Sequence, residues 1–114
     1  MKIILAILSI LLLACTTQKT KMPTDILSEI VFVNILKEVH LEESSFELQK
    51  TQGIENARNE LTNNYTSIYS EYKISTIDFE NTLNYYTQHP EKLEKIYSSV
   101  LEQLTEEQTI LNQQ

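Results

Sequence analysis

The chain has 114 residues, and nine Lys and Arg against sixteen Asp and Glu give it a formal net charge of −7. Because such an acidic chain is repelled by phosphates of nucleic acid and by anionic lipid head groups, we expect no nucleic-acid partner. One glycine and two prolines leave few turn signals, and the chain has no tryptophan, which together argue against a β-sandwich or a β-barrel.

The N-terminal residues have the pattern of a secretory signal. Lys2 is followed by an almost unbroken apolar run over residues 3–14. A positive charge before a short apolar run is typical of a signal peptide, and a helix of this length is too short to cross roughly 30 Å of hydrocarbon. The run ends in Leu12-Leu13-Ala14-Cys15, which resembles the lipobox of bacterial lipoproteins.

The lipobox resemblance implies that Cys15 receives a diacylglyceryl group on its sulfur, that the chain is cut after Ala14, and that the new amino terminus is acylated. The alternative is that Cys15 is an ordinary thiol. As the only cysteine it cannot form an internal disulfide. Without residues 1–14 the net charge is −8, so the acyl chains, rather than the protein surface, would hold the chain at a membrane.

Two long helices are predicted next, after a polar tether over residues 15–22. Apolar residues recur at three- and four-residue steps from Ile30 to Leu48, with Ser28 as a plausible N-cap. The only glycine, Gly53, indicates a turn. A second apolar period over residues 54–72 predicts a partner helix that runs back antiparallel to the first.

Two further helices complete the predicted domain, which spans residues 23–114. Ser75 and Asp78 resemble a capping box at the start of a short helix, and Pro90 is suited to the first position of a long one. The apolar stripe of the long helix consists of Leu93, Ile96, Tyr97, Val100, Leu101 and Leu104. The segment from Thr105 to Gln114 is mostly polar, and we expect it to fray.

The predicted fold is therefore all-α, a small bundle of three to four helices. It contains a long helical hairpin, a short helix and a long C-terminal helix. The alternative is that an exposed part of one stripe binds another chain, because regular amphipathic helices also suit coiled-coil pairing.

Four short stretches resemble a family of uncharacterised lipoproteins from Bacteroidetes, the domain of unknown function 4296. They are Met22-Pro23, Glu38-Val39-His40-Leu41-Glu42-Glu43-Ser44, Ile74-Ser75-Thr76-Ile77-Asp78-Phe79, and Tyr85-Tyr86…His89-Pro90…Leu93…Ile96-Tyr97. The resemblance implies a location in the cell envelope and a helical fold. It implies no activity.

One polar constellation on the first long helix is a candidate site. His40, Glu43 and Glu47 lie at helical spacing and could offer ligands to a divalent metal. The chain has no His-Glu-x-x-His motif, so we expect neither a metal nor another cofactor.

Glu43 projects only about 40° from the centre of the apolar face, an unusual place for a carboxylate. Arg58, the only arginine, lies near the apolar stripe of the second helix, and the midpoint between Glu43 and Arg58 falls next to the predicted turn. We therefore predict a structural pair of Glu43 and Arg58, with His40 or a tyrosine hydroxyl nearby. The alternative is that Glu43 reaches solvent while the stem of Arg58 covers apolar surface.

Catalysis finds little support in the sequence. The chain has no convincing pair of nucleophile and base and no glycine-rich phosphate loop, so we expect no enzyme. We expect a membrane-anchored envelope lipoprotein that acts as a protein-interaction or assembly module. The alternative is a small-ligand or metal-binding lipoprotein that uses a tyrosine-lined groove with His40 and Glu43. Thr16-Thr17 after Cys15 lacks the aspartate associated with inner-membrane retention, which favours the periplasmic face of the outer membrane.

Overall fold

The computed structural model describes residues 22–114. The signal peptide, Cys15 and most of the predicted tether lie outside the described residues. Within them the chain forms four helices and no strand: α2 (Glu29–Gln49), α3 (Ile54–Glu71), α4 (Thr76–Thr87) and α5 (Pro90–Asn112). The predicted all-α fold, with a hairpin, a short helix and a long final helix, is confirmed.

Two of the helix starts follow the predicted capping chemistry. The Ser28 side chain accepts a hydrogen bond from the backbone N–H of Val31 at the start of α2. At α4 the capping box is complete, because the Ser75 hydroxyl accepts from the N–H of Asp78 while the Asp78 carboxylate accepts from the N–H of Ser75. Hydrogen bonding of the Asp78 carboxylate, first to the backbone N–H of Ser75 and then to the Ser75 side chain, lowers the pKa of Asp78, so its contribution to stability is lost as the pH falls through that lowered pKa.

The end of α3 explains why the apolar period stops near Lys73. Lys73 has a φ of 56°, in the left-handed region, which reverses the chain. The N–H of Ile74 bonds to the carbonyl of Tyr69 and the N–H of Lys73 to that of Ser70, the two hydrogen bonds of a Schellman motif. This turn directs the chain away from the hairpin and into α4.

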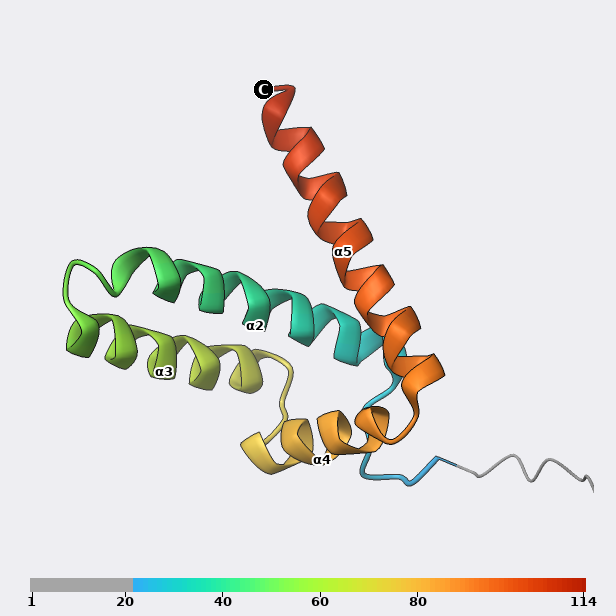
Figure 1. Ribbon diagram of the computed structural model, residues 1–114. Coiled ribbons are helices and arrows are strands. Elements are labelled where there is room, and N and C mark those ends of the chain that lie inside the picture. Colours follow the sequence, from blue (N-terminus) through green and yellow to red (C-terminus); the bar gives the residue numbers. More distant parts are fainter. Residues whose placement is uncertain (1–21) are drawn as a thin grey trace, which may run out of the picture.

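The core forms where α2 meets the other three helices. In Figure 1, α2 and α3 lie side by side as an antiparallel hairpin, α4 lies beneath them, and α5 crosses α2 near its N-terminal end. Phe32, Ile35 and Tyr86 are completely or almost completely buried at this junction. The Phe32 ring lies 5.7 Å from that of Phe79 and 5.3 Å from that of Tyr86, centroid to centroid. The core is therefore built around aromatic side chains of α2 and α4.

The segment that leads into α2 is fastened to α4 through its backbone. The Thr82 hydroxyl accepts from the N–H of Leu27, and the Tyr86 hydroxyl donates to the carbonyl of Leu27 over 2.9 Å. The same Tyr86 oxygen lies 3.7 Å from the sulfur of Met22. Met22, the last residue of the predicted tether, thus contacts the folded domain. These contacts fix the place where the chain enters the domain, beside α4.

Replacing Tyr86 with phenylalanine is expected to destabilise the domain by about 1–3 kcal/mol, because the partly buried carbonyl of Leu27 would lose its hydrogen-bond donor. Chemical denaturation of both proteins measures this difference. The matched control is Tyr85→Phe, since among the described residues the Tyr85 hydroxyl makes no hydrogen bond, and its loss should change stability by less than about 0.5 kcal/mol. Equal effects of the two substitutions would contradict the proposed role of the Tyr86 hydroxyl.

The last helix differs from the sequence prediction in two ways. The segment from Thr105 does not fray, because α5 continues to Asn112. The ammonium group of Lys37 lies 2.6 Å from the carboxylate of Glu107 and fastens this part of α5 to α2. In addition, Tyr97 and Leu101 do not join the buried stripe, since they are 44% and 66% exposed. The crossing of α5 over α2 covers only one side of the stripe.

Candidate functional site

The predicted polar constellation lies on the surface between α2 and α3. His40 Nδ1 is 3.3 Å from a carboxylate oxygen of Glu43, and the Tyr65 hydroxyl of α3 donates to the other Glu43 oxygen over 3.0 Å. The Glu43 side chain is 49% exposed. The His40 ring also lies 6.0 Å from the ring of Tyr97 on α5. The structure thus brings His40 of α2 and the Tyr65 hydroxyl of α3 to Glu43, and it places the Tyr97 ring of α5 beside His40.

The predicted pair of Glu43 and Arg58 does not form. The Arg58 guanidinium lies 3.5 Å from Glu55, one helical turn away on α3, and its side chain is 61% exposed. The prediction was wrong because it assumed a hairpin that is symmetrical about residues 50 and 51. The residues that pair across the hairpin have their midpoints at residues 53 to 55, about one turn further along. Glu43 is therefore level with Tyr65, and Arg58 lies about 10 Å further along the hairpin.

Three carboxylates of α2 accept hydrogen bonds from uncharged side chains of α3 and its C-cap residue, Tyr72. We call Glu38, Glu42 and Glu43 the carboxylate row. The Tyr72 hydroxyl donates to Glu38 over 2.7 Å, and the Asn64 amide donates to Glu42 over 2.6 Å, beside the bond from Tyr65 to Glu43. The sequence predicted a tyrosine hydroxyl near Glu43, but it did not predict the contacts of Glu38 and Glu42, because the prediction was built around a cationic partner. The spacing of Asn64, Tyr65 and Tyr72 along α3 was the only signal of the row.

The carboxylate row also changes the ionisation of its tyrosine partners. Burial, the hydrogen bond to Glu38 and the charge of Glu38 raise the pKa of Tyr72 to about 12. Burial and Glu43 act on Tyr65 in the same direction and raise its pKa further. Because a tyrosine must be neutral to donate, the stability from these contacts is fully present below pH 10 and is lost as the pH rises through the raised pKa values. At physiological pH these tyrosines are therefore neutral, and the hydrogen bonds of the carboxylate row join α2 and α3.

The coupling between Glu43 and Tyr65 can be measured with a double-mutant cycle. We expect Glu43→Ala and Tyr65→Phe to show a coupling of about 0.5–1 kcal/mol in the free energy of unfolding, at the lower end because Glu43 is half exposed. The matched cycle of Glu43→Ala with Arg58→Ala should show no coupling, because these side chains do not meet. Coupling only in the Arg58 cycle would contradict the observed pairing.

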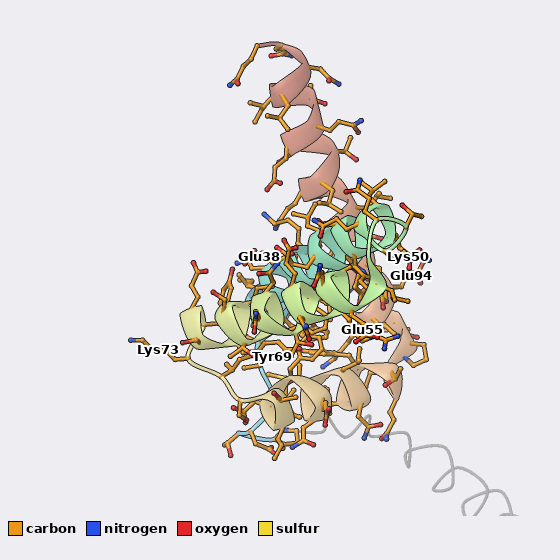
Figure 2. The ribbon with its side chains drawn as sticks, turned by 90° about the vertical axis from the view of Figure 1, so that its left-hand side faces the viewer. Glu38, Lys50, Glu55, Tyr69, Lys73 and Glu94 are labelled. Atoms are coloured by element: carbon orange, nitrogen blue, oxygen red, sulfur yellow. The ribbon has the colours of Figure 1, made fainter. Side chains whose placement is uncertain are left out.

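Two surface depressions lie near these residues. One of about 580 Å³ is bordered by His40, Glu43 and Leu61. Another of about 350 Å³ lies between α3 and α4 and is lined by Tyr65, Tyr69 and Phe79. Figure 2 shows Tyr69 between these two helices, where its ring lies 5.3 Å from that of Phe79. Both depressions are open to solvent, whereas sites for small ligands enclose most of the ligand surface.

Metal ligands do not gather at this site. Over residues 22–114, no three side chains of His, Cys, Asp or Glu come together as a metal site would require. The second histidine, His89, lies at the start of α5, where its ring stacks on Tyr85 and its Nδ1 lies 2.7 Å from the Tyr85 carbonyl. His40 and His89 therefore have separate surroundings.

The most distinctive exposed feature is an apolar stripe on α5. We call Tyr97, Leu101, Leu104, Gln108 and Leu111 the α5 seam. Leu101 is 66% and Leu111 is 69% exposed, and Leu104 is half-buried. The C-terminal half of α5 extends beyond the other helices (Figure 1), and Figure 2 shows the same from a direction turned by 90°. An apolar stripe on a projecting helix is the kind of surface that binds another protein.

The described helices are not suited to crossing a bilayer, since none of those in residues 22–114 combines the required length with the required hydropathy. Comparison with known families matches residues 23–110 to the family described as Domain of unknown function (DUF4296). No curated protein and no solved structure matches the chain.

Proposed function

We propose that this chain, which belongs to the DUF4296 family, is a lipid-anchored protein-interaction module of the bacterial cell envelope, without enzymatic activity. The α5 seam is the observation that carries the proposal. It places two large aliphatic side chains, Leu101 and Leu111, in solvent on a helix that extends beyond the rest of the domain. Isolated exposed apolar residues are common, but a stripe at heptad spacing on a projecting helix favours a protein partner.

The attachment to a membrane is the second part of the proposal and rests on the sequence. Leu12-Leu13-Ala14-Cys15 would place the acyl chains only seven residues before Met22, the first described residue. In the Bacteroidetes cell that the resemblance implies, Thr16-Thr17 after the cysteine favours the periplasmic face of the outer membrane. The contacts of Tyr86 and Thr82 with the entry segment hold the start of the domain beside α4, and Figure 1 shows the end of α5 at the opposite side of the fold. The seam would therefore be held away from the lipid surface.

A small-ligand binder is the alternative candidate. The groove lined by Tyr65 and Tyr69 favours it, because its volume of about 350 Å³ lies within the range of ligand sites. The open shape of the groove favours a weak ligand at most. Ligand binding in this groove would protect the two tyrosine rings from solvent and would not depend on Leu101 or Leu111.

The proposed function can be tested by recovering the lipidated protein, at its native level, from intact envelopes after mild chemical crosslinking. We expect at least one envelope protein to be enriched. The matched control carries residues 1–22 of this chain in front of an unrelated soluble domain, so that proteins recovered through the anchor alone are removed. If the two samples contain the same proteins, the helical domain is not an interaction module.

A further inference from the structure

We propose that the outward side of α4 lies against the phospholipid head groups of the membrane that holds the lipid anchor. We call Ile77, Asn81, Asn84 and Gln88 the α4 outer face. The inference rests on the proposed function, because it requires acyl chains on Cys15, and it adds the side of the domain that contacts the lipid. In this orientation the C-terminal half of α5 points away from the bilayer.

The α4 outer face is exposed and has no charged residue. At 100° per residue its four side chains lie within an arc of about 60°, opposite the buried side chains of Phe79, Thr82 and Tyr86. Ile77 is 65% exposed, and the other three residues are carboxamides. A carboxamide offers donors and acceptors to the polar groups of a lipid. A single isoleucine enters the interfacial layer without the cost of desolvating a charge.

Aromatic and cationic side chains border one edge of the α4 outer face. The Tyr85 ring lies 4.2 Å from the ring of His89, centroid to centroid, and Lys92 Nζ lies 5.8 Å from the centre of the Tyr85 ring. Tyrosine rings are enriched where a protein meets the head groups, and a lysine there keeps its ammonium group in the polar layer. Among the described residues Lys92 has no ion-pair partner, so a lipid phosphate can take this place. Because Glu80 borders the opposite edge, we expect the Tyr85 edge to lie deeper.

The lipid anchor is attached on the same side of the fold. The sulfur of Met22 lies 3.7 Å from the Tyr86 hydroxyl of α4, and Cys15 is only seven residues earlier. Seven residues can span at most about 25 Å. Figures 1 and 2, which differ by a turn of 90°, both place α4 at the end of the fold opposite to the C-terminal half of α5. The anchor therefore keeps α4 close to the lipid.

The net charge of the chain lies in the other parts of the fold. Residues 15–28 and 73–97 comprise the tether, the entry segment, α4 and the first two turns of α5, and together they have five Lys against five Asp and Glu. Residues 29–72 and 98–114 have three Lys and Arg against eleven Glu, which is the whole net charge of −8 that remains without residues 1–14. An anionic membrane repels this acidic part and not the neutral one, so that charge turns α4 toward the lipid.

The contact does not need to be strong, because the anchor already brings the two surfaces together. A short flexible tether gives an effective concentration on the order of a millimolar. A contact far too weak to hold the free domain at a bilayer is therefore occupied in the anchored protein. The acyl chains attach the domain, and the α4 outer face orients it.

Fluorescence quenching in vesicles tests this orientation. The lipidated protein is reconstituted into vesicles of phosphatidylethanolamine and phosphatidylglycerol that contain a lipid with a nitroxide on its head group. Because Cys15 is the only cysteine and its sulfur carries the lipid, one introduced cysteine is a unique position for a bimane fluorophore. We expect at least fivefold stronger quenching at Asn84→Cys than at Asn112→Cys. Asn112 is the matched control, since it is an exposed asparagine at the end of α5.

Added negative charge on the α4 outer face should lift it from the lipid. With bimane at Gln88→Cys, the double variant Asn81→Glu with Asn84→Glu should lower the quenching at least threefold. The matched control places the same two charges on α3, as Asn63→Glu with Ser67→Glu, and should leave the quenching at residue 88 unchanged. Because all four substituted side chains are exposed, neither double variant should change the melting temperature.

The outcomes distinguish this inference from the proposed function. Equal quenching at residues 84 and 112, or no effect of the glutamates on α4, would overturn the inference and leave the protein-interaction proposal intact. Stronger quenching at residue 112 than at residue 84 would mean that α5 lies on the lipid, and would overturn both. If the purified protein carries no acyl chains, the lipid anchor of the proposed function is wrong, and the inference falls with it.

Discussion

Replacing Phe32 with alanine is expected to remove about 3–5 kcal/mol of folding free energy. Phe32 is completely buried, and its ring contacts Phe79 and Tyr86 of α4, so that its loss would leave a cavity where the hairpin meets α4. A domain of about 90 residues has a total stability of roughly 5–14 kcal/mol. The substitution therefore removes a large part of the margin that keeps this domain folded.

The measurement for Phe32→Ala is a thermal and a chemical denaturation of residues 22–114 in parallel with the unaltered protein. At about 4–8 °C per kcal/mol, the midpoint should fall by about 12–40 °C. Leu48→Ala is the matched control, because Leu48 lies on the same helix but is 77% exposed, and its loss should cost less than about 0.5 kcal/mol. Similar midpoints for the two variants would mean that the junction around Phe32 is not the centre of the core.

The helices of this fold could be predicted from the sequence because their signals are local. The three- and four-residue period of α2 and α3, the Ser28 cap and the Ser75 capping box depend only on residues within one or two turns. The left-handed turn at Lys73 could not be predicted in this way. Its place is usually taken by glycine, and the packing of Ile74 against the core holds a lysine there instead.

The contacts between helices could not be predicted, because they depend on how two helices slide and rotate against each other. A shift of seven residues along α3, about two turns, replaces Arg58 with Tyr65 as the partner of Glu43, and no residue near the turn signals this shift. Likewise the apolar period of α5 does not say which side α2 covers. Leu101 and Val100 are neighbours in the same predicted stripe, yet Leu101 is 66% and Val100 is 3% exposed.

The continuation of α5 to Asn112 also depends on a contact between helices that could not be predicted from the sequence. From its composition alone the segment after Thr105 is expected to fray, since helix ends lack partners for their last carbonyl groups. The ion pair between Lys37 and Glu107 joins positions 70 residues apart and stabilises two turns of helix that carry Gln108 and Leu111. The ion pair between Lys37 and Glu107 thus supports the C-terminal part of the α5 seam, on which the proposed function depends.

Replacing Cys15 with serine is expected to release the protein from membranes. Cys15 lies outside the described residues, so this expectation rests on the lipobox and on charge. Two or more acyl chains hold a protein stably at a bilayer, whereas a body with a net charge of −8 has no electrostatic attraction to anionic head groups. Without the thiol no diacylglyceryl group can be attached, and we expect the fraction of protein that sediments with membranes to fall at least tenfold.

The control for the Cys15 experiment is Thr16→Ser, a change beside the lipobox that keeps the thiol and should leave sedimentation unchanged. Intact-mass measurement must accompany it, because an uncut signal peptide could hold the serine variant at the membrane through residues 3–14. A serine variant that has lost residues 1–14 and still sediments after a high-salt wash would contradict lipid anchoring. So would an unaltered protein whose mature N-terminus carries no acyl mass. In either case the membrane attachment would have to come from a partner protein, and the α5 seam would be the first surface on which to seek it.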